Sequence, residues 1–235
     1  MQINGAHVLV TGANRGLGRQ FVLSLLERGA GKVYATARRP DLIDVPGVIP
    51  LRLDVTDPAS VAAAALAAPD VKIVINNAGI ATGANLVTGD LDTIRREMDT
   101  HFYGTLHVVR AFAPQLADGA ILNVLSALSW LANDGAGAYH AAKAAEWALT
   151  NNVRLELAGQ RTLVTGLHLG AADTDMMAWY TGDKSAPEVI VAEALDGIEE
   201  HRSEVLADDW SRQVKAWLSD DPSVIYRKAS EALTT

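Results

Sequence analysis

The strongest constraint on the fold of this chain is a regular alternation of short apolar runs with segments of helical periodicity. Seven apolar runs recur along the 235 residues, and most of them are apolar at nearly every position. Such runs are typical of strands covered by helices on both faces, and helices between successive strands require parallel pairing. The pattern therefore predicts one doubly wound α/β domain over residues 1–235, with a mostly parallel seven-stranded sheet and helices on both faces.

The positions of the elements follow from the same pattern. The expected strands are residues 6–12, 32–37, 48–53, 71–76, 120–126, 162–169 and 203–207. The expected helices are residues 17–28, 57–67, 92–116, 138–158 and 187–201, with further helix after the last strand. Asp57 and Pro58 mark a helix start, because aspartate favours the N-cap and proline the first helical position. In such a sheet, a ligand binds at the carboxyl ends of the strands.

Composition narrows the possible chemistry. The chain has no cysteine, which excludes disulfides, thiolate nucleophiles and cysteine-rich metal sites. The six histidines show no metal-binding spacing, so no metal is expected. The formal net charge of −8 disfavours nucleic acid as a partner. With no secretory signal and no apolar run of membrane-spanning length, we expect a cytoplasmic protein without a membrane partner.

A glycine-rich turn joins the first expected strand to the first expected helix and reads TGANRGLG at residues 11–18. Gly12 permits a sharp turn, while Gly16 and Gly18 leave room for a pyrophosphate beside the helix start. The spacing is neither GxGxxG nor that of a P-loop, and such a turn can also be a plain connection. Its place in the first strand–helix unit favours dinucleotide binding.

The end of the second expected strand indicates which dinucleotide would bind. A carboxylate there would repel a 2′-phosphate, but Ala37 occupies this position and Arg38 and Arg39 follow it. Arg15 in the glycine-rich turn could reach the same point, and guanidinium groups bind phosphate well. Solvated surface charges are the alternative interpretation. Three converging arginines on an acidic chain favour NADP(H).

Ser126, Tyr139 and Lys143 form a candidate catalytic group. Tyr139 and Lys143 are four residues apart on one expected helix and therefore share a face. A nearby ammonium lowers the pKa of a phenol, which allows it to act as an acid or base. Ser126 ends the fifth expected strand, where its hydroxyl could hydrogen-bond a substrate carbonyl oxygen. Each residue alone also has a plain structural explanation.

Taken together, these motifs resemble the short-chain dehydrogenases/reductases along nearly the whole chain. The matching pieces, in order, are TGANRGLG at residues 11–18, Asp54-Val55, NNAG at residues 76–79, Ser126, and YHAAK at residues 139–143. The resemblance implies a Rossmann-type fold and an NADP(H)-dependent oxidoreductase acting as a carbonyl reductase or alcohol dehydrogenase. It also implies a homodimer or homotetramer paired through the helices at 92–116 and 138–158.

The resemblance assigns a role to each matching residue. Tyr139 would donate a proton to the carbonyl oxygen in reduction, Lys143 would hold the nicotinamide ribose and lower the Tyr139 pKa, and Ser126 would polarise the substrate oxygen. The residues expected to contact the cofactor are Gly12, Asn14, Arg15, Gly16, Leu17, Gly18, Arg38, Arg39, Asp54, Val55, Asn76, Asn77, Ala78, Gly79, Tyr139, Lys143, Gly170 and Thr174.

Two positions depart from the family pattern. His101 stands where the family has an asparagine that bends the middle helix and holds a water beside the lysine. A histidine could hold that water or relay a proton as part of the catalytic group, and it could equally be a packed helix residue. Leu169 replaces the proline of a Pro-Gly pair after the sixth strand, while Gly170 and Thr174 still match.

Residues 173–186 are expected to form a substrate lid, because methionines and aromatic residues make an adaptable cover that excludes water. Ordinary helix packing is the alternative. The expected substrate contacts are Ser126, Trp130, Met176, Met177, Trp179 and Tyr180. A catalytically weak dinucleotide-binding sensor or scaffold is the competing function, and an epimerase or dehydratase would usually need a longer chain.

Overall fold

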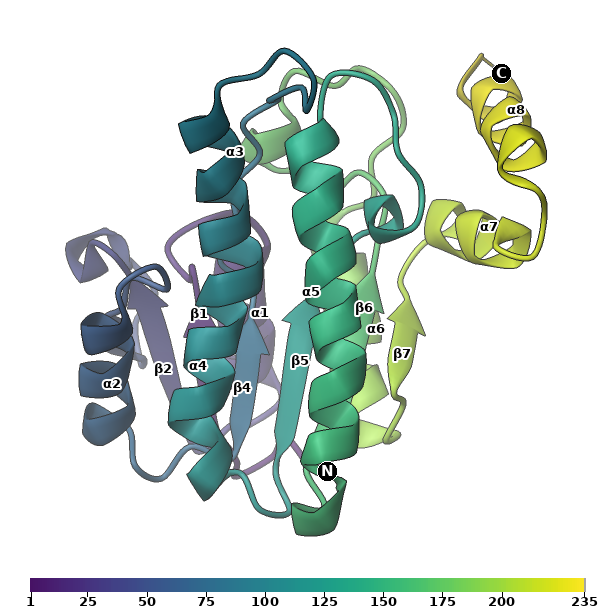
Figure 1. Cartoon of the computed structure of the whole chain (residues 1–235). Coiled ribbons are helices and arrows are strands. Elements are labelled where there is room, and N and C mark those ends of the chain that lie inside the picture. The colour runs from purple at the N-terminus through teal and green to yellow at the C-terminus, as the bar shows by residue number, and fades with distance from the viewer. Residues whose placement is uncertain (235) are drawn as a thin grey trace.

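The computed structural model of the chain describes residues 1–234 and shows a parallel sheet between two layers of helices (Figure 1). The strands are β1 (His7–Thr11), β2 (Lys32–Ala37), β3 (Ile49–Arg52), β4 (Ile73–Asn76), β5 (Ala120–Val124), β6 (Leu163–His168) and β7 (Glu204–Leu206). Their order is β3-β2-β1-β4-β5-β6-β7, and every neighbouring pair is parallel. The predicted fold class is confirmed, with a sheet that is wholly parallel.

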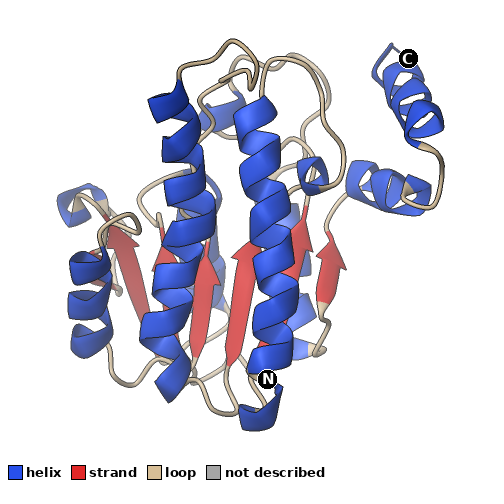
Figure 2. Ribbon diagram, viewed as in Figure 1, coloured by secondary structure: helices blue, strands red, loops and turns tan. Residues whose placement is uncertain are grey.

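Eight α-helices surround the sheet within the described residues (Figure 2). They are α1 (Gly16–Glu27), α2 (Pro58–Ala67), α3 (Leu91–Met98), α4 (Gly104–Phe112), α5 (Gly137–Glu156), α6 (Pro187–Glu199), α7 (Asp209–Trp217) and α8 (Pro222–Thr234). Asp57 caps α2 as predicted, since its side chain accepts a hydrogen bond from the backbone N–H of Ala59. None of these helices has both the length and the apolar character that crossing a membrane would demand.

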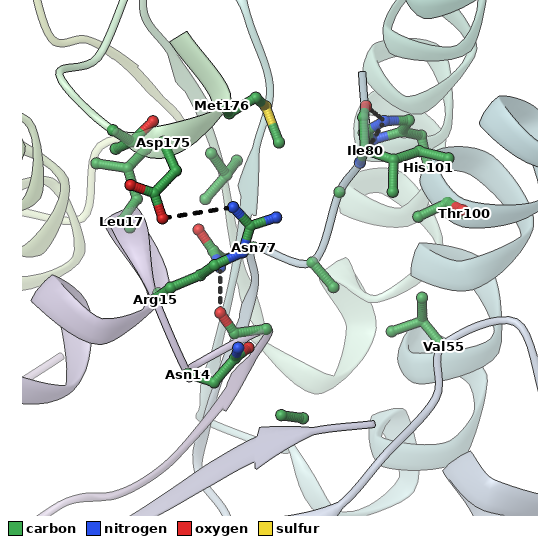
Figure 3. A pocket seen from close by; sticks show the side chains of 18 of the residues that line it. Asn14, Arg15, Leu17, Val55, Asn77, Ile80, Thr100, His101, Asp175 and Met176 are labelled. Carbon is green, nitrogen blue, oxygen red and sulfur yellow. Dashed lines mark hydrogen bonds and ion pairs between the residues drawn. The ribbon is translucent and has the colours of Figure 1, made fainter. Parts of the chain in front are cut away.

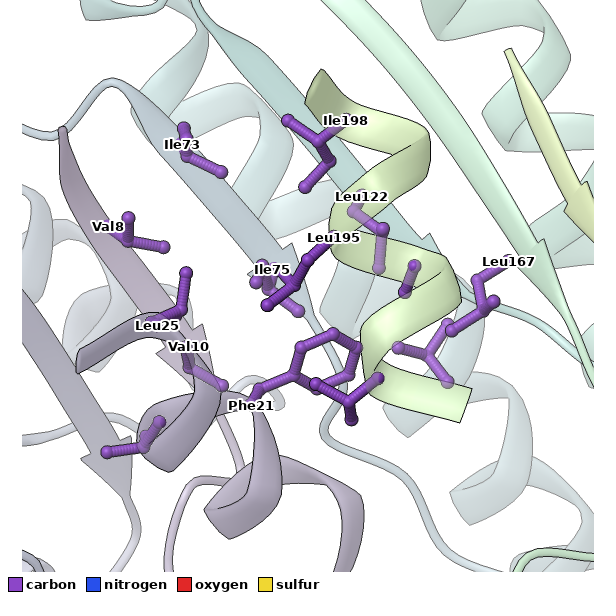
Figure 4. Close-up of a cluster of buried hydrophobic side chains, with 14 of the residues drawn as sticks. Val8, Val10, Phe21, Leu25, Ile73, Ile75, Leu122, Leu167, Leu195 and Ile198 are labelled. Atoms are coloured by element: carbon purple, nitrogen blue, oxygen red, sulfur yellow. The ribbon is translucent and has the colours of Figure 1, made fainter. Parts of the chain in front are cut away.

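Two apolar cores hold the helices on the sheet, one on each face. On one face, Phe21 and Leu25 of α1 and Leu195 and Ile198 of α6 pack against the strands (Figure 4). All four side chains are fully buried, and each contributes on the order of 2 kcal/mol through removal of its apolar surface from water. On the other face, α2, α4 and α5 cover the sheet. The two cores leave the carboxyl ends of the strands open.

The long helical region predicted over residues 92–116 is present, but it is not a regular α-helix throughout. It runs without a gap from α3 through a π-helical segment at Asp99–Tyr103 and α4 to a short 3₁₀ turn at Ala113–Gln115. A π-helical segment inserts an extra residue into the helical turn and is frequent at functional sites. Here it contains His101, whose ring is buried beside the carboxyl end of the sheet. The interruption therefore occurs where the helix passes the site.

The C-terminal helices form a separate small cluster beyond the β7 edge of the sheet (Figure 1). Trp210 and Trp217 of α7 and Ile225 of α8 pack there with Trp130 from the loop after β5. The indole of Trp130 stacks on His168 of β6, with ring centroids 3.7 Å apart. This cluster therefore fixes the backbone that leads from β5 and β6 into the site.

Candidate active site

A pocket of about 340 Å³ opens at the carboxyl ends of the strands. It lies at the β1–β4 junction, where the strand order reverses and open α/β sheets bind their ligands. The predicted site residues that line it are Gly12, Asn14, Arg15, Gly16, Leu17, Gly18, Arg38, Arg39, Asp54, Val55, Asn77, Ala78, Gly79, His101, Ser126, Tyr139, Lys143, Gly170, Thr174, Met176 and Met177. Residues that are far apart in the sequence, from Gly12 to Met177, therefore meet in one cavity.

The glycine-rich turn forms the middle of this pocket. Gly12 has a φ of +66°, a left-handed conformation that favours glycine, and a Cβ at Gly18 would overlap the carbonyl oxygen of Gly12. Asn77 holds the turn by donating from Nδ2 to the carbonyl oxygens of Thr11 (2.9 Å) and Gly12 (3.2 Å). Helix α1 begins here without a side-chain cap, so its first N–H groups are open to an anion.

One end of the pocket is basic. Arg38 and Arg39 are exposed at the end of β2, which lacks a carboxylate because Ala37 is its last residue. Arg39 lies 3.3 Å from Asp41, and Arg15 reaches across the pocket mouth to within 3.7 Å of Asp175 (Figure 3). This donor set fits a dinucleotide: guanidinium groups for a phosphate, open helix N–H groups for the pyrophosphate, and Lys143 at the far end.

Ser126 and Tyr139 lie at the other end of the pocket. Ser126 follows β5 and caps a 3₁₀ turn, where its Oγ accepts a hydrogen bond from the N–H of Leu128 at 3.1 Å. Tyr139 lies in the first turn of α5 and is half-buried. Burial raises the Tyr139 pKa above its ordinary value, and the neighbouring Lys143 only partly offsets this effect. The Lys143 effect predicted from the sequence is present, but desolvation outweighs it.

Lys143 is buried and held by two hydrogen bonds. Its Nζ donates to the carbonyl oxygen of Val124 and to Oε2 of Glu146, both at 2.7 Å. Burial alone would lower the Lys143 pKa, but the Glu146 carboxylate outweighs this and keeps the pKa above its ordinary value. Sequence reasoning missed Glu146, although its position three residues after Lys143 on one helix is a recognisable ion-pair spacing.

His101 faces Tyr139 from the π-helical segment. The two rings meet edge to face with centroids 5.3 Å apart. The Nε2 atom of His101 lies 2.8 Å from the carbonyl oxygen of Ile80 and 3.4 Å from Oε2 of Glu97 (Figure 3). A Cβ at Gly79 would come within 2.7 Å of the His101 ring, so the glycine makes room for it. Glu97, four residues before His101, was also missed.

Four expected contacts lie elsewhere. Trp130 does not line this pocket, because the 3₁₀ turn after Ser126 directs it onto His168 and beneath the ammonium of Lys215. Asn76 is buried and donates to Asn123 across the sheet. Trp179 and Tyr180 lie beyond the pocket lining, and 74% of Trp179 is exposed. The short turn at Asp175–Met177 brings only the two methionines and Asp175 to the pocket.

Comparisons with known proteins agree with this geometry. A family profile described as short chain dehydrogenase matches residues 6–184. An NADPH-dependent 1-acyldihydroxyacetone phosphate reductase of Schizosaccharomyces pombe is 35% identical over 182 residues, covering 73% of this chain and 61% of that protein. Carbonyl reductase (NADPH) 2 of Sus scrofa is 30% identical over 195 residues, covering 78% of each.

A solved structure supports the same assignment over nearly the full chain. A short chain dehydrogenase from Burkholderia cenocepacia J2315, in complex with NADP, matches with a TM-score of 0.93 and 36% identity. The match covers 97% of this chain and 98% of that chain. This protein is therefore a member of the short-chain dehydrogenase/reductase family of oxidoreductases, whose members bind a nicotinamide dinucleotide.

Proposed function

We propose that the protein is an NADP(H)-dependent carbonyl reductase, which interconverts a ketone or aldehyde and the corresponding alcohol. One observation carries the proposal: a single pocket joins Ser126, Tyr139 and Lys143 to the open start of α1 and to Arg38 and Arg39. The proton-transfer group and the candidate phosphate-binding groups are thus the two ends of one cavity. Relatives whose names specify NADPH or carbonyl reduction support the same choice.

The side chains divide the reaction between them. A bound dinucleotide supplies the hydride. The Ser126 hydroxyl donates a hydrogen bond to the substrate carbonyl oxygen, and the Tyr139 phenol gives that oxygen its proton. The Lys143 ammonium, fixed by Val124 and Glu146, holds the nicotinamide ribose and stabilises the phenolate that remains. Met176 and Met177 line the apolar side of the cavity and exclude water from it.

NADPH oxidation across a panel of ketones and aldehydes tests the reaction. Tyr139→Phe should remove at least about 100-fold of the turnover, in the range expected for a lost acid catalyst, while NADPH binding persists. Tyr103→Phe, which alters a half-exposed phenol outside the pocket, is the matched control. Turnover by Tyr139→Phe at the parent rate would show that Tyr139 is not the proton donor.

The choice of dinucleotide has its own test. Ala37→Asp combined with Arg38→Ala should weaken NADPH binding about tenfold or more and favour NADH, because a charge-assisted phosphate contact is replaced by repulsion. Arg95→Ala removes an equally exposed arginine from α3 and should leave both affinities unchanged. Unaltered affinities in the Ala37→Asp variant would show that the phosphate does not bind there.

The remaining features of the proposal concern organisation. We propose that residues 1–235 form one domain, that residues 173–186 act as a substrate lid, and that the protein works in the cytoplasm as a homodimer or homotetramer. The bridge between Ala172 and Ser185 ties the two ends of the lid segment together, which leaves the stretch between them free to move as a unit. Sedimentation analysis of the purified chain measures the oligomeric state directly, and a monomer would contradict the proposed homodimer or homotetramer.

A further inference from the structure

Four titratable side chains are buried together behind the catalytic phenol. Glu97, His101, Lys143 and Glu146 have exposed fractions of 0%, 1%, 5% and 1%. Burying a charge is costly unless it is paired and hydrogen-bonded, so such a cluster needs a reason. The proposed reaction uses Lys143 directly. It gives no role to either glutamate.

Glu146 is fixed by contacts to both of its oxygens. Oε2 accepts from the Lys143 ammonium at 2.7 Å, and Oε1 accepts from the hydroxyl of Thr105 in α4 at 2.8 Å. Lys143 is held in turn by the carbonyl oxygen of Val124 in β5. The carboxylate and the ammonium therefore form a rigid pair that spans α4, α5 and the sheet.

A second carboxylate faces the pair from α3. The His101 ring lies between them, with Nδ1 3.8 Å from Oε2 of Glu146 and Nε2 3.4 Å from Oε2 of Glu97. Glu97 also accepts from the N–H of Thr82 at 2.6 Å. Burial alone would raise the Glu97 pKa, but these donors keep it below its ordinary value, so Glu97 is a carboxylate.

The other titratable neighbours of Tyr139 bring no positive charge. His140 follows it on α5, and its ring is 6.3 Å away. Burial lowers the His140 pKa, which keeps the ring neutral. Burial likewise lowers the pKa of His168, on β6 behind Ser126, to about 3.

We propose that Glu146 is a positioning residue that partly neutralises Lys143 and thereby favours the protonated form of the Tyr139 phenol, which is the form that carbonyl reduction uses. Reduction needs a protonated phenol as acid, whereas oxidation needs a phenolate as base. The Lys143 Nζ lies 5.9 Å from the Tyr139 ring centroid and has its counter-ion at 2.7 Å, so the Glu146 carboxylate offsets part of the field of the ammonium at the phenol. The use of the protonated phenol in reduction rests on the proposed function, but the effect of Glu146 on the protonation of Tyr139 does not.

The protonation of Tyr139 can be measured without cofactor or substrate. Labelling the five tyrosines with ¹³C at Cζ reports each phenol in the nuclear magnetic resonance spectrum, and Tyr139→Phe assigns the signal. In the parent, Tyr139 should titrate above the ordinary range for tyrosine, because burial and the Glu146 carboxylate both raise its pKa. Titration of parent Tyr139 below about pH 9 would overturn the proposal without the need for any further variant.

Variants at Glu146 test the cause. Glu146→Gln should lower the midpoint of the Tyr139 titration by at least about one pH unit, a tenfold larger phenolate fraction. Glu146→Asp retains the charge and should stay nearer the parent. Glu156→Gln removes an exposed carboxylate about 15 Å further along α5 and should change nothing. An unshifted midpoint in Glu146→Gln, an equal shift in Glu156→Gln, or an Asp variant that matches the Gln variant would each overturn the proposal.

Kinetic measurements distinguish a failure of the proposed role of Glu146 from a failure of the proposed carbonyl reductase function. If the parent interconverts carbonyls and alcohols, the rate of alcohol oxidation should rise with pH as the phenolate forms, and in Glu146→Gln this rise should move to lower pH by the same interval as the phenol titration. A rise that stays in place would refute the role of Glu146 in the reaction. If the parent reduces no carbonyl at all, the proposed function fails, while the tyrosine titration still decides the role of Glu146.

Discussion

Acidification should destabilise this protein through His168. The side chain is fully buried in β6, and its Nδ1 donates to the carbonyl oxygen of Ser126 at 3.0 Å. Trp130 stacks on the ring with an interplanar angle of 17°. Desolvation is the main reason why the pKa of His168 falls from its ordinary value to about 3. The folded protein therefore keeps this ring neutral under conditions in which the unfolded chain protonates it.

The sign and size of the effect follow from linkage. Below about pH 6.5, His168 is protonated in the unfolded chain but stays neutral in the folded protein. The free energy of unfolding therefore decreases as the pH falls. The loss continues until the folded-state pKa of about 3 is reached. Well inside this window each pH unit costs about 1.4 kcal/mol, and lowering the pH from 6.5, where the unfolded chain is already half protonated, to 4.5 costs about 2 kcal/mol.

Urea unfolding followed by tryptophan fluorescence at several pH values measures the loss. His168→Gln removes the titrating ring and should flatten the pH dependence by about one proton between roughly pH 6 and 4. His201→Asn, at an exposed position with a φ of +59° that asparagine tolerates, is the control and should follow the parent. If parent and His168→Gln lose stability in parallel on acidification, burial of a neutral histidine is not the cause.

Three further predictions concern the framework of the site. Gly18→Ala places a Cβ against the carbonyl oxygen of Gly12, so it should lower the unfolding free energy by about 1–3 kcal/mol and weaken dinucleotide binding. Gly159→Ala adds a Cβ in open space and should do neither, and equal effects of the two variants in calorimetry would contradict the steric argument. Asp57→Ala removes the N-cap of α2 and should lower the unfolding free energy by about 1 kcal/mol, and an unchanged urea midpoint would show that the cap contributes nothing. Phe21→Ala empties a fully buried position and should cost about 3–5 kcal/mol in the same assay, whereas a loss below 1 kcal/mol would mean that α1 collapses into the space.

Most of the fold could be predicted from the sequence because buried parallel strands are apolar at nearly every position. The predicted second strand, residues 32–37, has the observed bounds, and the ends of the other strands differ by at most two residues, where pairing stops before the apolar run does. The interruption at Asp99–Tyr103 could not be predicted in this way. A π-helical segment shifts the periodicity by a single residue, and apolar residues continue on both sides of it.

In the site, the sequence pattern predicts which backbone segments meet, but it does not predict the direction of each side chain. The glycine-rich turn, Ser126 and Tyr139 converge because each directly follows a strand or begins a helix at one edge of the sheet. Trp130 is only four residues from Ser126, yet after the intervening 3₁₀ turn its indole stacks on His168 of β6 and does not line the pocket. Glu146 was missed for a different reason. Its spacing of three residues from Lys143 is visible in the sequence, but only the structure shows that the ion pair is buried.

His101 forms one buried arrangement with Glu97 and Glu146. Its ring fits only because Gly79 has no side chain and because the π-helical segment carries it between Ile80 and Glu146. Once there, its Nε2 lies 3.4 Å from Oε2 of Glu97, an oxygen that accepts no hydrogen bond from the described residues. An asparagine at position 101 is shorter and could not bridge two carboxylates that face it from α3 and α5. The departure from the family pattern and the two buried glutamates are therefore one arrangement, and the charge at Tyr139 depends on all three residues together.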